Sequence, residues 1–153
     1  MDFVHLHLHT TYSFLDGYNP IPKAVARAKE LGMTAMAITD HNHLGGVVDF
    51  QKECNKQGIK PILGYEGYFT WNMDKTARPI DERTSEAVEA ATKDGLLEEG
   101  VKYKKSEIKD IIAPYMWDVH QYHIILLAQN QTGWQNLVKI QSESADRCTY
   151  NGR

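Results

Sequence analysis

The sequence predicts an α/β fold in which strands and helices alternate, and a barrel is the arrangement that fits best. Segments with strand and helix periodicity follow one another as β-α-β-α-β over the first 65 residues, and helical connections of this length join parallel strands. A further strand and helix follow residue 120. Barrels of this type take about 250 residues, so the 153 residues of this chain would form the N-terminal part only.

The first half of the chain divides into three expected strands and two helices. Residues 3–9 alternate between apolar residues and histidine, which is the period of a strand with Leu6 and Leu8 on one face. Asn19 is expected as the N-cap of a helix that begins at Pro20 and that Gly32 ends. The other expected elements are a strand at 34–39, a helix at 46–57 closed by Gly58, and a strand from Ile59 to Tyr65.

The second half begins with a segment that interrupts this alternation. Residues 71–119 are rich in charges of both signs and contain expected helices near 82–94 and 105–113. We interpret the segment as a charged insertion on the surface of a single partial domain that spans residues 1–153, with a lid or partner-binding element as the alternative. A strand at 122–128 and an amphipathic helix at 133–145 follow it.

Composition limits the classes of function. The formal net charge is −3, so a role on DNA would have to come from a local site or from a larger protein. Two cysteines do not suggest a disulfide framework. No apolar run approaches the roughly 20 residues that cross a bilayer. We therefore expect a cytoplasmic protein that does not associate with membranes.

The alternating histidines are the first candidate for chemistry. Residues two apart on a strand point the same way and lie roughly 6.5–7 Å apart, so His7 and His9 could converge on one metal ion. His5 shares their face. We expect it to orient a ligand rather than to bind the metal itself.

More candidate ligands follow at the ends of the first two expected strands. Asp16 stands in an Asp-Gly pair, which suits a turn and, beside a histidine strand, equally suits a metal ligand. His41 follows the second expected strand, at the carboxyl end where parallel α/β folds bind ligands. Asp40 is expected to orient His41 or the backbone, and His43 is a weaker candidate.

The later strands add an acid and a histidine. Glu66 is expected at the end of the third strand between two glycines, a placement that suits a carboxylate shared by two metal ions. His123 begins the next strand and is preferred over His120. Such a mixture of imidazole and carboxylate favours Zn²⁺, Mn²⁺ or Fe²⁺ over Ca²⁺. Two or three such ions would polarise a phosphoester and supply a nucleophile from water near neutral pH.

Four motifs, taken in order, resemble the PHP family of phosphoesterases. They are His-Leu-His-Thr-Thr-Tyr-Ser (7–13), Thr-Asp-His (39–41), Gly-Tyr-Glu (64–66) and Tyr-His-Ile-Ile-Leu-Leu-Ala-Gln-Asn-Gln-Thr-Gly-Trp-Gln-Asn-Leu (122–137). More narrowly, they are similar to the N-terminal PHP domains of bacterial and phage replicative polymerases, the polymerase III α subunits. The resemblance covers the chain except for about 71–119. It implies a distorted seven-stranded β/α barrel with a site for up to three metal ions.

The resemblance also implies roles for individual residues. The first metal would be held by His7 and His9, the second by His123, and the third by Asp16 and His41, while Glu66 would bridge the first two. Catalysis would depend on His7, His9, His41 and Glu66. The family completes its site with a cysteine or histidine and an Asp-x-His pair. Residues 124–153 hold no such pair, and Cys148 lies in a polar tail, so this ligand set is expected to be incomplete.

Three functions follow from the resemblance. The first is a metal-dependent phosphoesterase within a DNA polymerase, acting as a 3′–5′ exonuclease that proofreads DNA, with DNA and other replisome subunits as partners. The second is a structural or interaction module of the polymerase without catalysis. The third is a free-standing phosphatase for small molecules, which the Thr-Gly-Trp-Gln-Asn-Leu segment (132–137) makes less favoured. Activity of these 153 residues alone is not implied.

Overall fold

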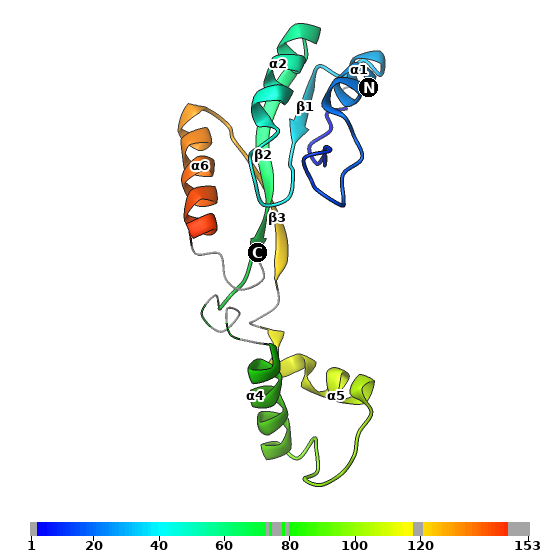
Figure 1. Ribbon diagram of the computed structural model, residues 1–153, viewed down its shortest axis with the longest axis vertical. Helices are drawn as coiled ribbons and strands as arrows, with labels where there is room; N and C mark the ends of the chain where they lie inside the picture. The colour runs from blue at the N-terminus through cyan, green and yellow to red at the C-terminus, as the bar shows by residue number, and fades with distance from the viewer. Residues whose placement is uncertain (1–2, 73, 75–77, 79, 118–120, 147–153) are drawn as a thin grey trace. The chain divides into compact units, whose positions relative to one another are not determined.

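The computed structural model describes residues 3–72, 74, 78, 80–117 and 121–146. These residues fall into two compact units (Figure 1). Unit 1 combines Met1–Tyr68 with His123–Arg153, and unit 2 is Phe69–Tyr122. Each unit is described by itself below.

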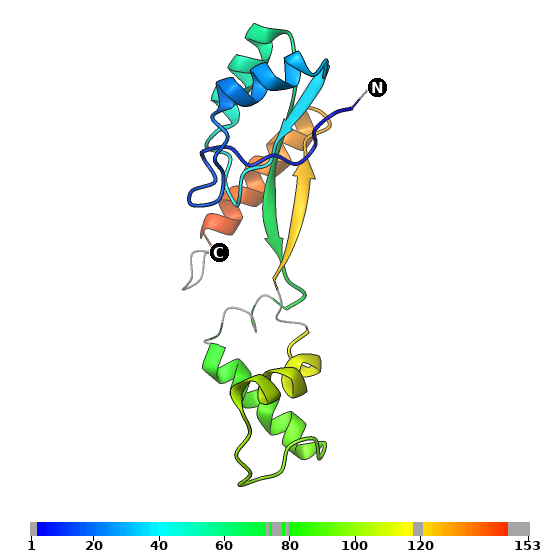
Figure 2. The same cartoon turned by 90° about the vertical axis from the view of Figure 1, so that its right-hand side faces the viewer.

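A three-stranded sheet forms the centre of unit 1. Its strands are β1 (Ala35–Ile38), β2 (Lys60–Phe69) and β3 (Tyr122–Leu127), in the order β1-β2-β3. β1 and β2 are parallel, as the helical connection between them predicts. β3 runs antiparallel to β2 (Figure 2), since Ala128 N–H donates to Leu63 O while His123 lies beside Glu66. The expected α/β class is confirmed, and the described strands form an open sheet rather than a closed barrel.

The strand predicted at residues 3–9 is not a regular strand in the structure. Residues 3–9 run beside β1 but form no regular strand, with a single parallel bridge between His5 and Met36. His5 O and Leu8 O accept backbone N–H groups of Ala37 and Thr39, but two N–H groups of the segment donate to side chains and so interrupt the ladder. Leu8 N–H donates to Thr39 Oγ1 at 2.8 Å, and Thr10 N–H donates to Asp40 Oδ1 at 2.6 Å. Leu8 is buried, whereas Leu6, expected on the same face, is exposed.

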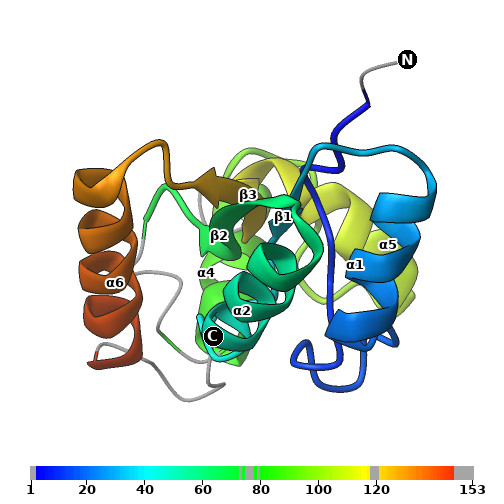
Figure 3. The same ribbon diagram turned by 90° about the horizontal axis from the view of Figure 1, so that it is seen from above.

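Three helices accompany the sheet: α1 (Ile21–Glu30), α2 (Val47–Gln57) and α6 (Gln131–Asp146). α1 and α2 pack against each other (Figure 3). The N-cap of α1 is Pro20 and not Asn19, so this prediction is wrong by one residue. Asn19 has a different role, because its side-chain Nδ2 donates to His9 O at 2.9 Å and its carbonyl accepts Thr11 N–H at 3.1 Å. It thereby ties the start of α1 to the histidine segment.

The core of unit 1 lies between the sheet and these helices. Phe50 and Cys54 on α2 and Val25 on α1 are fully buried against Ile38 of β1. Trp134 of α6 packs at the edge of the same cluster. The apolar stripes of α1 and α2 explain this arrangement, because each helix must bury one face. The core therefore fixes β1, which His41 follows, and β2, which contains Glu66.

Unit 2 contains α4 (Ile80–Lys93), α5 (Lys105–Ile112) and a 3₁₀ turn, η1 (Ala113–Tyr115). Its own apolar cluster centres on Ala87, Ala91, Leu97 and Ile112. The helices expected near 82–94 and 105–113 are confirmed. That this unit is an insertion within one domain stays a prediction. No helix within the described residues is long and apolar enough to cross a membrane.

Candidate metal centre

Six side chains from separate segments of unit 1 converge beyond the carboxyl end of β1. They form three overlapping groups of potential ligands, in each of which the ligand atoms lie within 4.8 Å of one another. The groups are His7, His9 and Glu66; His9, Asp16 and His41; and His41, Glu66 and His123. These are the six residues that the sequence analysis selects as ligands. Their roles as metal ligands stay predictions.

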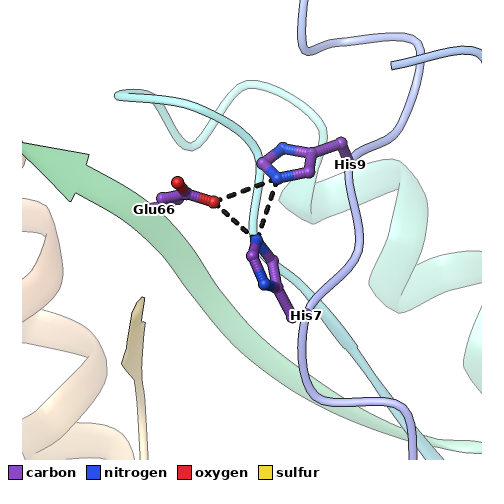
Figure 4. Close-up of side chains that lie close together, drawn as sticks. All are labelled: His7, His9 and Glu66. Atoms are coloured by element: carbon purple, nitrogen blue, oxygen red, sulfur yellow. Dashed lines mark hydrogen bonds and ion pairs between the residues drawn. The ribbon is translucent and has the colours of Figure 1, made fainter. Parts of the chain in front are cut away.

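The first group is the tightest (Figure 4). Glu66 Oε2 lies 2.6 Å from His7 Nε2 and 3.0 Å from His9 Nε2, and the two imidazole nitrogens are 3.0 Å apart. Both histidines come from the extended N-terminal segment, and Glu66 comes from β2. Two ring nitrogens and one carboxylate oxygen thus face a common point.

The other two groups share His41. Its Nε2 lies 3.0 Å from Asp16 Oδ2, and its Nδ1 lies 3.8 Å from Glu66 Oε1. His123 Nδ1 contacts the same Glu66 oxygen. The ring of His41 also stacks on that of His9, with centroids 4.2 Å apart, and the Tyr68 ring lies against both His41 and His123.

Glu66 is the acid that joins the first group to the third. The sequence predicted Glu66 at the end of its strand, and this position is wrong. Glu66 lies within β2, because the strand continues to Phe69. Its side chain is only 3% exposed, whereas that of His7 is 53% exposed. Burial raises the pKa of Glu66, but the hydrogen bond with His7 and the charges of His41, His7 and His9 outweigh it, so the pKa falls below its usual value. A buried carboxylate that stays ionised suits a shared metal ligand.

Asp40 organises the loop that carries two of these ligands. Its carboxylate accepts hydrogen bonds from Thr10 N–H at 2.6 Å, Thr10 Oγ1 at 2.8 Å and Ser13 Oγ at 2.7 Å. All three residues are buried. One of these bonds is to the backbone and two are to side-chain hydroxyls, so the expected role of Asp40, orienting His41 or the backbone, stays a prediction. Ser13 and Thr10 were not predicted as site residues, and their only signal in the sequence was their place in the His-x-His-Thr-x-x-Ser motif.

Two other candidate histidines lie outside the cluster. The ring of His5 packs against Phe3, with centroids 5.9 Å apart, and joins none of the three groups. His43 accepts a hydrogen bond from Gly45 N–H at Nδ1 and donates from Nε2 to Tyr12 O. Both of its ring nitrogens are therefore occupied by the backbone. His120 and Cys148 lie outside the described residues.

The backbone beside the cluster adopts uncommon conformations. Leu15, which precedes Asp16, has φ +66°, and Asn42, which follows His41, has φ +52°. Left-handed backbone at residues other than glycine is uncommon and is often found at functional sites. Gly64 allows another close approach, because a Cβ there would lie 2.3 Å from Leu126 O on β3. Close pairing of β2 with β3 brings His123 to Glu66.

The chemistry of the donor set fits a divalent metal. His41 Nδ1 is buried and has no hydrogen-bond partner in the described part of the chain, since Glu66 Oε1 lies 3.8 Å away. A buried polar atom without a partner is uncommon and fits a cluster that an ion completes. Ligand atoms bound at about 2.1 Å in tetrahedral geometry lie about 3.4 Å apart. The contacts of 2.6 and 3.0 Å from Glu66 to His7 and His9 need to open by less than about 1 Å to reach that spacing.

Comparison with known proteins gives a family match over most of the chain. The family model described as the PHP domain matches residues 5–153. The DNA polymerase III subunit alpha of Borreliella burgdorferi is 34% identical over 142 residues, which cover 93% of this chain and 9% of that protein. The corresponding protein of Aquifex aeolicus is 35% identical over 91% of this chain and 9% of its own length. This chain thus spans about a tenth of these relatives.

Shorter and more distant matches complete the comparison. An error-prone DNA polymerase of Symbiobacterium thermophilum is 48% identical over 66 residues, 43% of this chain and 6% of that protein. Among solved structures, an amidohydrolase from Chromobacterium violaceum matches with a TM-score of 0.41 at 18% identity, covering 74% of this chain and 49% of its own. A metal-dependent phosphoesterase from Bifidobacterium adolescentis matches with a TM-score of 0.37 at 15% identity, covering 89% and 73%.

Proposed function

The chain belongs to the PHP domain family, and from this membership we propose that its histidine–carboxylate cluster is a divalent-metal centre that hydrolyses phosphoesters. The observation that supports the proposal is the sharing of ligands. Glu66 belongs to two of the three groups. Its Oε2 faces His7 and His9 while its Oε1 faces His41 and His123, and a carboxylate shared in this way suits a site for two neighbouring ions. We propose Zn²⁺, Mn²⁺ or Fe²⁺ as the ion, with up to three ions in a complete site.

Each residue of the cluster has a proposed role. His7 and His9 hold the first ion together with Glu66, His123 holds a second with Glu66, and His41 with Asp16 holds a third. Bound ions polarise a phosphoester and lower the pKa of water toward neutrality. The protein contributes a buried acid and imidazoles that are fixed in place before substrate arrives. Glu66 is nearly inaccessible while His7 and His123 are half exposed, so a substrate would reach the cluster from the histidine side.

DNA is the proposed substrate. The relatives of this chain are named as subunits of DNA polymerase, and we propose that the domain belongs to such a polymerase and removes nucleotides from DNA 3′ ends. The formal net charge of −3 provides no general attraction to DNA. Binding of the DNA would therefore come mainly from the ions, from other parts of the polymerase and from its partner subunits in the replisome.

The test is metal-dependent release of nucleotides from the 3′ end of a labelled DNA strand. The polymerase that carries this domain would be compared with its His7→Ala/His9→Ala and Glu66→Gln variants, with Glu53→Gln as the matched control. Glu53 lies on α2, where it bonds with Gln57 and Lys56, away from the cluster. Release should be lost in the first two variants and kept in the control. Unchanged release in the histidine variant contradicts the proposal.

Metal analysis provides a second, independent test. The wild-type protein should retain a divalent ion after gel filtration, and the His7→Ala/His9→Ala variant should retain less. A protein that binds no ion under these conditions would instead serve as a structural or interaction module.

A further inference from the structure

The hydroxyl of Ser13 lies at the centre of the candidate site without belonging to any ligand group. Ser13 is 1% exposed. Its Oγ lies 2.7 Å from Asp40 Oδ1, 3.1 Å from the backbone nitrogen of His41 and 3.1 Å from His9 Nδ1. A serine hydroxyl can donate one hydrogen bond and accept two, so these three neighbours use its full capacity.

The direction of each bond follows from what the neighbours can do. The Asp40 carboxylate only accepts, and its oxygens already receive bonds from the Thr10 N–H and hydroxyl, so the Ser13 proton must point to Asp40. The His41 backbone N–H can only donate. The remaining lone pair of Ser13 Oγ faces His9 Nδ1. This contact is favourable only if Nδ1 carries a hydrogen, because otherwise two lone pairs would meet in a buried place.

We infer that Ser13 fixes the tautomer of His9, so that Nδ1 keeps its proton and Nε2 is the nitrogen left for a metal ion. The inference rests on the proposed metal centre. His9 Nε2 is the atom 3.0 Å from both His7 Nε2 and Glu66 Oε2. Since Nδ1 is occupied by Ser13, His9 serves the group it forms with His7 and Glu66, and the ion near Asp16 depends mainly on His41.

The backbone of Ser13 extends the same role to the neighbouring loop. The Ser13 carbonyl accepts the N–H of Asp16 at 3.0 Å and that of Gly17 at 2.7 Å. One residue therefore contacts three proposed ligands: the ring of His9, the main chain of His41 and the main chain of Asp16. Ser13 is a positioning residue in this site. It orients ligands without touching an ion.

The first test reads the tautomer directly by ¹⁵N NMR of the histidine rings in the metal-free chain. At a pH where His9 is neutral, its proton should reside on Nδ1. This is a demanding test, because Glu66 Oε2 lies 3.0 Å from Nε2 and competes for the proton. Glu66 Oε2 already faces His7 at 2.6 Å, which weakens that competition. A proton found on Nε2 overturns the inference, whether or not the protein hydrolyses DNA.

The second test compares Zn²⁺ affinity in Ser13→Ala with that in Ser85→Ala, a matched change at a hydroxyl that bonds only to its own helix. Ser13→Ala should weaken Zn²⁺ binding by ~10–100-fold, the usual effect of losing the hydrogen-bond partner of a histidine ligand. Ser85→Ala should not. Ser13→Thr keeps the hydroxyl and should restore most of the affinity.

The outcomes separate a tautomer role from a merely structural one and from the proposed function. A Ser13→Ala protein that unfolds at lower denaturant but keeps His9 protonated on Nδ1 contradicts the inference, as does unchanged Zn²⁺ affinity. If Ser13→Ala does not fold, the wild-type spectrum alone decides. A wild-type chain with the Nδ1 tautomer that binds no ion would support the inference about Ser13 while refuting the metal centre.

Discussion

Glu66 and His41 lie opposite each other in a parallel bridge between β2 and the chain that leaves β1. The Glu66 N–H donates to Asp40 O at 3.0 Å, and Glu66 O accepts the Asn42 N–H at 2.8 Å. These two backbone bonds on either side of His41 fix the spacing of its ring from the Glu66 carboxylate. The position of the Glu66 carboxylate, which two groups share, is thus set by main-chain bonds as well as by its side-chain contacts.

Glu66→Gln should remove more than one ion. An amide is a weak metal ligand compared with a carboxylate, and Glu66 belongs to the groups of both His7 and His123. Bound metal per chain should fall, and the remaining affinity should be weaker by more than ~100-fold, since hydrogen-bond partners of ligands alone contribute ~10–100-fold. Elemental analysis and Zn²⁺ titration measure this, with Glu53→Gln as control. Full occupancy in Glu66→Gln would show that Glu66 is not a ligand.

Gly17→Ala should destabilise the protein and disturb the Asp16 loop. A Cβ at position 17 would lie 1.8 Å from Thr10 O, so the backbone must move. The cost should be on the order of 3 kcal/mol. Gly58→Ala is the matched control, because a Cβ there meets nothing within 4 Å and its left-handed φ alone costs about 1 kcal/mol. Urea unfolding compares the two. Equal losses would mean that the Gly17 loop relaxes freely.

Cys54 should make stability fall in alkaline solution. Burial raises the pKa of the Cys54 thiol to about 11. The usual pKa of a cysteine thiol is 9.0, so above pH 9 the unfolded chain loses a proton that the folded chain keeps. Stability from this group is complete below pH 9 and declines as the pH rises toward 11. Urea unfolding at pH 8 and pH 10 should show a larger loss for wild type than for Cys54→Ala. Equal losses contradict the prediction.

Ile112→Ala should loosen unit 2 alone. Ile112 is buried in a cluster made by residues of α4, α5 and the loop between them, and truncation of a buried isoleucine costs about 2–5 kcal/mol. Amide hydrogen exchange should quicken in α4 and α5, while α1 and α2 keep their protection. Faster exchange in both units would show that they unfold together. Ile80→Ala, at an exposed position of α4, is the control.

The sequence predicted those parts of the fold that follow from local pattern. The apolar stripes and glycine ends of α1 and α2 located both helices, and the helical connection predicted the parallel pairing of β1 with β2. Residues 3–9 show the limit of periodicity. Alternation predicted the direction of the His7 and His9 side chains, but the backbone there bonds to the side chains of Thr39 and Asp40, and no periodic signal reports such bonds.

The candidate ligands were predictable because their chemistry is explicit in the residue type. The polar residues that hold these ligands in place were not predictable, because serine and asparagine are common in loops of every kind. Ser13 bonds to Asp40, 27 residues away, and Asn19 bonds to His9 across a turn. His43 was a candidate ligand because it is a histidine close to His41 in the sequence. The structure shows that both of its ring nitrogens bond to the backbone, which the sequence could not reveal.

The six proposed ligands come from positions 7 to 123 of the chain, so the cluster exists only after distant segments have met. In the unfolded chain these side chains are far apart and bind ions weakly, which makes an ion a selective ligand of the native state. By mass action, an ion present at 100 times its dissociation constant would add about 2.7 kcal/mol of stability. An ion held by His7, His9 and Glu66 would act as a removable cross-link between the N-terminal segment and β2, and chelators should lower the thermal midpoint accordingly.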